Sequence, residues 1–308
     1  MSQYPQNFLF IIGSPKAGTT SLANWLDQRD DMVLGTIKEP RYFTDFVDRD
    51  WTGPGCEEFL ATLLADEAAY QNNFLGPMSE KPAATAGWAI DASTDYLWCE
   101  ASAAKIKLFS QSRPCKIICI LRDPVERALS EYNHTLRDRL ETLTLLDALD
   151  QEQTRLTQGW QPLFYHKRRS TCLDDLQRYV DNFGDDLLVL GFHEFNEPDN
   201  LLTKVHNFLG LPGPVISSQK ALNDSALPRN GIFSRLYANE HLKSFSRAFT
   251  NPKIRAALRG ATHVSAKQLA TTTAAETDRL RDILADEISA CVASPLVATE
   301  HWKTATNP

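Results

Sequence analysis

Short apolar runs alternate with amphipathic stretches along most of the 308-residue chain. An unbroken apolar run is typical of a strand buried on both faces of a parallel sheet, and apolar residues three or four positions apart indicate a helix with one buried face. The helical spacing predicts helices that begin near Thr19 and Pro124. Further helices are predicted at about 100–109, 173–183, 200–209 and 275–291, and strands at 8–12, 32–34, 88–90, 116–121 and 187–190.

This alternation of strands and helices predicts one architecture. Strand–helix–strand units connect through right-handed crossovers and build a parallel sheet with helices on both faces. We therefore predict an α/β fold of three layers, in which helices flank a mostly parallel central sheet. The chain has no internal repeat, low-complexity tract or evident linker, so we expect a single domain over residues 1–308.

Two stretches interrupt the alternation. Residues 44–86 are irregular, with several glycines and prolines, and contain one predicted helix that carries Phe59, Leu60, Leu63 and Leu64. We expect this insertion to form part of a lid or of an acceptor wall, or else plain surface. The second stretch, residues 212–231, is predicted to be a long loop.

Composition and charge narrow the possible partners. The net charge is −7, which does not favour a nucleic acid or an anionic membrane as partner. No apolar run approaches the roughly 20 residues that span a bilayer, and the first residues do not resemble a signal peptide, so we expect a cytoplasmic protein without a membrane span. The six cysteines lack metal-ligand spacing, and we expect Cys115 and Cys119 to be buried thiols.

The first predicted strand runs directly into a glycine-bounded loop. In GSPKAGTT, Gly13 and Gly18 bracket four residues, and Thr19 and Thr20 begin the following helix. Backbone N–H groups of such a loop, together with the helix N-terminus, form a site for an anion such as phosphate. In nucleotide triphosphatases a lysine follows the second glycine, but here Thr19 takes that place and Lys16 lies inside the loop.

Other residues that carry chemistry also follow predicted strands. Glu39, Asp91 and Arg122 each come shortly after one of them. Ligands of parallel sheets bind beyond the carboxyl ends of the strands. We therefore expect these three side chains and Lys16 to line one crevice.

Together these motifs resemble those of the sulfotransferases that use 3′-phosphoadenosine-5′-phosphosulfate (PAPS) as sulfuryl donor. Arg122 and Ser130, in LRDPVERALSEY, resemble their 3′-phosphate-binding pair. KEPRYF, residues 38–43, resembles the segment that carries a glutamate base in the carbohydrate, or heparan-type, branch. The loop that resembles their 5′-phosphosulfate-binding loop contains Ser14, Pro15, Lys16, Ala17, Gly18, Thr19 and Thr20.

The resemblance implies a P-loop-like sulfotransferase architecture. It also implies transfer of a sulfuryl group from PAPS to a hydroxyl or amine of an acceptor, either a saccharide or a small metabolite, with 3′-phosphoadenosine-5′-phosphate (PAP) as the other product. Lys16 would neutralise the leaving phosphate, and Glu39 would be the general base. Lys38 would hold the sulfuryl oxygens or the acceptor, and Arg229 would close over the 3′-phosphate. No metal is expected, because Lys16 and Arg122 take the charge-neutralising role.

Several of these residues also have an ordinary structural interpretation. Lys16 could be a solvated lysine in a turn, and Lys38 with Glu39 a solvated pair. Arg122 could pair with Asp123 or Glu126 at the start of its helix. Two further features have two interpretations each. The HKRR run, residues 166–169, is either an acceptor contact or a solvated basic run, and His134 is either a second-choice base or a solvent-facing residue.

Two other functions stay open. A P-loop kinase would use Asp91 as its Walker B acid, although Thr19 stands where its lysine belongs and a second Mg²⁺ acid is lacking. The second open function is that of a nucleotide-binding protein, which has the same fold but no catalytic activity. The sequence leaves the identity of the acceptor and the oligomeric state undetermined.

Overall fold

The computed structural model describes residues 5–74, 87–213, 215, 226–228, 263–265 and 272–305. Within them, five strands form the central sheet in the order β2-β3-β1-β4-β5, and every pairing in that sheet is parallel. These strands are β1 (Asn7–Gly13), β2 (Met32–Leu34), β3 (Trp88–Asp91), β4 (Cys115–Leu121) and β5 (Leu187–Gly191). The prediction of an α/β fold with a parallel sheet is confirmed.

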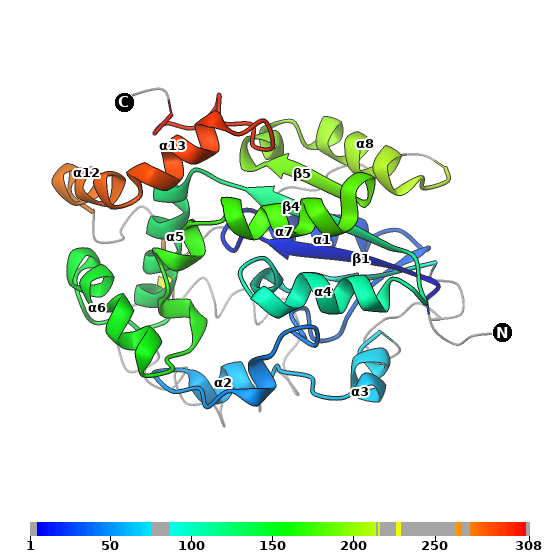
Figure 1. The fold of residues 1–308 in the computed structure, drawn as a ribbon, viewed down its shortest axis with the longest axis horizontal. Helices are drawn as coiled ribbons and strands as arrows, with labels where there is room; N and C mark the ends of the chain where they lie inside the picture. The colour runs from blue at the N-terminus through cyan, green and yellow to red at the C-terminus, as the bar shows by residue number, and fades with distance from the viewer. Residues whose placement is uncertain are drawn as a thin grey trace.

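Helices cover both faces of this sheet (Figure 1). Side chains alternate along β1, so that Phe8 and Phe10 pack toward α4 and α7 while Leu9 and Ile11 pack toward α1 and α8. The α-helices are α1 (Thr19–Leu26), α2 (Cys56–Leu60), α3 (Glu67–Asn72), α4 (Glu100–Phe109), α5 (Pro124–Arg137), α6 (Leu145–Thr157), α7 (Leu173–Phe183), α8 (Pro198–Leu209), α12 (Ala274–Ile283) and α13 (Ala285–Ala293). A separate antiparallel pair joins β6 (Ala226–Pro228) to β7 (His263–Ser265).

Two helix predictions need correction. The stretch predicted as one helix at 275–291 is two helices, α12 and α13, because Leu284 between them leaves the helical conformation with φ of −103° and ψ of 9°. In the irregular insertion, α2 ends at Leu60, which is 43% exposed, so Leu63 and Leu64 lie beyond the helix that was predicted to carry them.

The described part of the insertion, residues 44–74, contributes to the interior. Phe46, Trp51 and Phe59 form a buried cluster with Trp98 and Phe164, which come from two distant segments. Residues 75–86 of the insertion and most of the predicted loop at 212–231 lie outside the described residues.

Two smaller predictions can also be compared with the structure. Cys115 and Cys119 are buried free thiols, as predicted. In the described ranges, every helix is too short or too polar to span a membrane.

Candidate active site

The carboxyl ends of β1, β2, β3 and β4 meet at one edge of the sheet, because all four strands run in the same direction. The glycine-bounded loop follows β1 at this edge. The Ser14 N–H donates to the Ile120 carbonyl at 2.6 Å, which holds the loop against β4. A β-carbon at Gly18, whose φ is 87°, would come within 2.8 Å of the Phe195 ring, so this close packing requires glycine. The loop then leads into α1 through Gly18, which caps the helix without a side chain, and a helix N-terminus that follows such a loop suits an anion.

Lys16 is a partly buried cation at the turn of this loop. Burial, and after it the nearby charge of Arg137, lower the pKa of its ammonium to about 8. The negative charges of Glu131 and Asp138 act in the opposite direction and raise the pKa of Lys16. Among the described residues, none of the carboxylates forms an ion pair with Lys16. A desolvated ammonium without a paired carboxylate is suited to an anionic ligand, and this burial disagrees with the interpretation of Lys16 as a solvated lysine.

Arg122 joins the loop to α5. Its Nη1 donates to the Lys16 carbonyl at 3.0 Å, and its guanidinium lies 4.6 Å from the centre of the Phe192 ring. Its Nη2 lies 3.4 Å from Glu126, so the structural pairing considered from the sequence is also present. Ser130 lies two turns along α5, partly exposed. The predicted pair thus brackets the first two turns of α5, and of the two it is Arg122 that contacts the loop.

Three buried polar atoms in this region lack a hydrogen-bond partner: Ser14 Oγ, Arg122 Nε and His134 Nδ1. Buried polar groups are nearly always satisfied, and each one that is not costs about 1–3 kcal/mol. Two of the three atoms can donate to an oxygen. Their gathering around Lys16 and the α1 N-terminus fits an anionic ligand with several oxygens.

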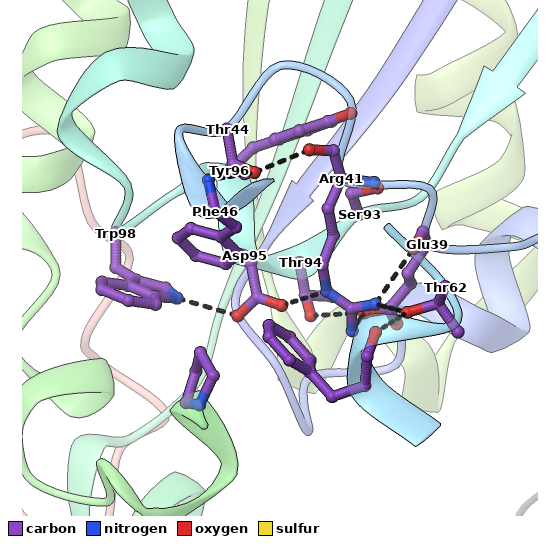
Figure 2. A network of polar contacts seen from close by, with 12 residues as sticks. Glu39, Arg41, Thr44, Phe46, Thr62, Ser93, Thr94, Asp95, Tyr96 and Trp98 are labelled. Carbon is purple, nitrogen blue, oxygen red and sulfur yellow. Dashed lines mark hydrogen bonds and ion pairs between the residues drawn. The ribbon is translucent and has the colours of Figure 1, made fainter. Parts of the chain in front are cut away.

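Glu39 lies at the same edge, held between two cations, Lys38 and Arg41 (Figure 2 shows Arg41). Its Oε1 is 2.5 Å from Lys38 Nζ, and its Oε2 is 3.0 Å from Arg41 Nη2 and accepts from the Thr94 hydroxyl at 3.2 Å. Burial raises the pKa of Glu39, but the charges of Lys38 and Arg41 outweigh it and bring the pKa to about 2. The Thr94 carbonyl also lies 3.3 Å from the position of a β-carbon on Gly13, so a single residue separates Glu39 from the phosphate loop.

The comparisons with known proteins agree with this geometry. No protein-family model and no curated protein matches the sequence. Among solved structures, a sulfotransferase from Alicyclobacillus acidocaldarius is 29% identical, with a TM-score of 0.62, over 84% of this chain and 96% of that one. The chain shares the fold of this sulfotransferase, which supports assignment to the same family and enzyme activity.

Two further similar structures have TM-scores below 0.5, and the assignment does not rest on them. Mouse sulfotransferase SULT7A1 complexed with PAP is 14% identical, with a TM-score of 0.42, over 94% of this chain and 86% of that one. The sulfotransferase domain of the Synechococcus PCC 7002 olefin synthase is 16% identical, with a TM-score of 0.38, over 92% of this chain and 96% of that one. The sulfotransferase assignment leaves the carbohydrate branch a prediction.

Asp95 links the segment that carries Glu39 to the rest of the molecule. Its Oδ2 accepts from Arg41 Nε at 2.5 Å, and its Oδ1 accepts from Trp98 Nε1 and from Arg169 Nη2, both at 2.8 Å (Figure 2 shows the first two). The Asp95 side chain is only 2% exposed. Arg41 therefore holds Glu39 through Nη2 and the buried carboxylate of Asp95 through Nε.

Two residues of the HKRR run, residues 166–169, are buried, so the interpretation as a solvated basic run is wrong for His166 and Arg169, whereas Lys167 is exposed. His166 is fully buried, and Arg169 is 5% exposed. Arg169 bridges Asp95 and Glu131, whose carboxylate on α5 is 2.5 Å from Arg169 Nη1. Arg168 is more exposed but pairs with Asp175 at 2.7 Å. The Arg169 guanidinium can be buried because both of its partners are carboxylates, and it connects Asp95, the partner of Arg41, with α5.

We expect Asp95→Ala to lower the free energy of unfolding by about 3–5 kcal/mol, because it leaves two guanidinium groups without their buried partner. Urea unfolding followed by circular dichroism would measure this. Asp150→Ala, at an exposed position of α6, is the matched control and should change stability by no more than about 0.5 kcal/mol. Equal stability of the two variants would show that the buried pairs contribute little.

Asp91 does not line the site as expected. It is fully buried, and its carboxylate accepts hydrogen bonds from the Ser93 N–H and hydroxyl and from the Tyr70 and Tyr96 hydroxyls. Burial raises the pKa of Asp91 to about 6 against these hydrogen bonds. A carboxylate so occupied anchors the end of β3, and it is poorly placed to act as the Walker B acid of a kinase.

His134 is less exposed than expected of a solvent-facing residue. Its side chain is 23% exposed, and its Nε2 lies 3.5 Å from Asp138 on the next turn of α5. Burial, and then the positive charge of Lys16, lower the pKa of His134 to about 4. At neutral pH the imidazole is uncharged and can accept a proton, and it lies within the electrostatic reach of the loop.

The sequence analysis missed four residues that shape this site: Arg41, Thr94, Asp95 and Phe192. The first lies within the KEPRYF motif, next to residues that were singled out, and a buried acid shortly after a strand was a weak signal for Asp95. Nothing in the sequence marked Thr94 or Phe192. Arg229, which was predicted to close over the 3′-phosphate, lies outside the described residues.

Proposed function

We propose that this sulfotransferase transfers a sulfuryl group from PAPS to a hydroxyl or amine of a saccharide or small metabolite. The observation that carries the proposal is the desolvated Lys16, without a paired carboxylate, in a glycine-bounded loop that Arg122 contacts directly. A sulfuryl group in transfer resembles the loose species of phosphoryl transfer, so catalysis consists mostly of positioning and charge stabilisation. The loop and α5 supply the hydrogen-bond donors that would position the donor and the positive charge that would stabilise the transition state.

The donor site would divide between two elements. The loop, with Ser14, Pro15, Lys16, Ala17, Gly18, Thr19 and Thr20, would bind the 5′-phosphosulfate through backbone N–H groups, hydroxyls and the Lys16 ammonium. Arg122 and Ser130 would bind the 3′-phosphate, the unpartnered Nε and the hydroxyl acting as donors. Lys16 would neutralise the charge that develops on the leaving phosphate. Arg229 stays a candidate to close over the 3′-phosphate.

Glu39 would be the general base for the acceptor. With a pKa of about 2 it is ionised at neutral pH, as a base must be, but a lysine holds one oxygen and an arginine the other. The side chain of Lys38 is 27% exposed, so it can leave Oε1 and turn to the sulfuryl oxygens or the acceptor. That movement would raise the pKa of Glu39 when the acceptor proton is to be taken.

His134 is the second candidate for the base. The observation in its favour is an uncharged imidazole near Lys16 with its Nδ1 unpartnered. The choice also affects the acceptor, because the saccharide proposal draws on the resemblance of residues 38–43 to the carbohydrate branch. The wider expectations, a single cytoplasmic domain whose residues 44–86 form a lid or acceptor wall, stay proposals alongside it.

We expect PAP to bind about ten- to a hundredfold more tightly than adenosine 5′-phosphate, which lacks only the 3′-phosphate, because hydrogen bonds to a charged group contribute about 1.5–3 kcal/mol. Titration calorimetry with and without Mg²⁺ would measure both affinities. Tighter, magnesium-dependent binding of ATP would instead support the kinase. Binding of PAP without sulfation of any acceptor class in a panel with labelled PAPS would support a catalytically silent protein.

A further inference from the structure

The chain segment that follows α13 returns to the sheet edge beside the candidate donor site. There Thr304 donates to Asp123 from its N–H and its hydroxyl, at 3.1 and 2.8 Å. His301, three residues earlier, lies against His193 of η6 (Phe192–Asn196), with ring centres 3.9 Å apart. Two imidazoles from distant parts of the sequence thus meet at one place.

A carboxylate completes this group. His193, Glu300 and His301 each offer a ligand atom, and these atoms all lie within 4.8 Å of one another. Nε2 of His301 is 3.8 Å from Oε1 of Glu300. Ligand atoms around a tetrahedral ion with bonds of about 2.0–2.1 Å are roughly 3.3 Å apart, so small side-chain rotations suffice. Both side chains are more than half exposed and free to make them.

The third side chain is held in place by the backbone. The His193 ring lies so close to Gly191 that a β-carbon there would come within 2.4 Å of Nδ1. Nδ1 is buried and makes no hydrogen bond among the described residues, so Nε2 is the nitrogen left to coordinate an ion. Two imidazole nitrogens and one carboxylate oxygen form a donor set that suits zinc and its neighbours in the transition series, whereas Mg²⁺ and Ca²⁺ prefer oxygen ligands alone.

We propose that His193, Glu300 and His301 form a binding site for a divalent transition-metal ion of the Zn²⁺ class, with water in the remaining position. The ion would join the segment after α13 to η6. Both partners touch the candidate donor site, since Phe192 of η6 contacts Arg122 and Lys303 pairs with Glu126. This site lies outside the proposed sulfuryl-transfer chemistry, and its existence does not depend on that proposal.

Titration calorimetry of the untagged protein with ZnCl₂ tests the site, with MgCl₂ as the comparison. We expect saturable binding of one Zn²⁺ per chain and no comparable binding of Mg²⁺. His301→Ala and Glu300→Gln, at exposed positions, should each weaken Zn²⁺ binding by at least about tenfold. Removal of a residue that only hydrogen-bonds to a metal ligand commonly causes a loss of affinity of that size, and a ligand itself should matter no less. Zn²⁺ should raise the melting temperature of the wild type and have little effect on that of His301→Ala.

His206→Ala is the matched control, because it removes a histidine of α8 outside the group. It should bind Zn²⁺ as the wild type does. Absence of saturable Zn²⁺ binding to the folded wild type would overturn the proposal. Undiminished binding in both His301→Ala and Glu300→Gln would also overturn it and would assign the ion to other histidines or to the thiols.

Discussion

Lys16→Ala is expected to lower the turnover number by about 10²–10³-fold, a loss of roughly 3–4 kcal/mol, while the protein remains folded. The ammonium matters most when charge develops on the leaving phosphate, so its removal raises the energy of the transition state more than that of the bound donor. Steady-state kinetics with labelled PAPS, at saturating donor and acceptor, would measure the effect.

Arg122→Ala is the contrasting variant for this prediction. A contact with the 3′-phosphate exists in the ground state and in the transition state alike, so its loss should mainly raise the donor KM. The Arg122 guanidinium also holds the Lys16 carbonyl, and a smaller secondary loss of turnover is expected from that contact. Normal turnover of Lys16→Ala with only a raised donor KM would show that Lys16 binds the donor and does not act in the chemical step.

The sheet could be predicted from the sequence because its strands are buried on both faces. All residues of β1 except Asn7 are buried, and the apolar run that this requires is visible without any tertiary information. The helices were predicted less completely than the strands. The helix α6 was missed, although Thr144 caps it by accepting from the Asp147 N–H and apolar residues follow at helical spacing. The break at Leu284 has no glycine or proline to mark it.

The anion loop could likewise be predicted, because its glycines and lysine lie close together in the sequence. The surroundings of Glu39 could not, because they depend on residues brought together from separate loops. Asp95 and Arg169 are 74 positions apart, and each would be expected at the surface if considered alone. Their burial follows from their pairing, which only the folded chain reveals. A charged residue in the sequence therefore does not reveal by itself that it has a buried partner.

The residues around Glu39 allow an experiment that identifies the general base. We expect Glu39→Gln to bind the donor normally and to lose about 10²–10⁴-fold in turnover, the usual range for general base catalysis. Glutamine keeps the size of the side chain and can still accept from Thr94 and Arg41, but it takes no proton. Rapid-mixing kinetics of single turnovers would separate this loss from product release.

His134→Ala is the variant that tests the alternative base. The two hypotheses predict opposite results for the turnover of Glu39→Gln and His134→Ala. If Glu39 is the base, His134→Ala keeps most of its turnover, and Lys38→Met makes the carboxylate of Glu39 a stronger base by removing the first of the charges that depress its pKa. The activity of Lys38→Met should then begin to fall at a higher pH than that of the wild type as the solution is made more acidic, because Glu39 is protonated earlier. Near-normal turnover of Glu39→Gln together with an inactive His134→Ala would assign the base to α5. It would also remove the main support for a saccharide acceptor, because that support rests on the glutamate of residues 38–43.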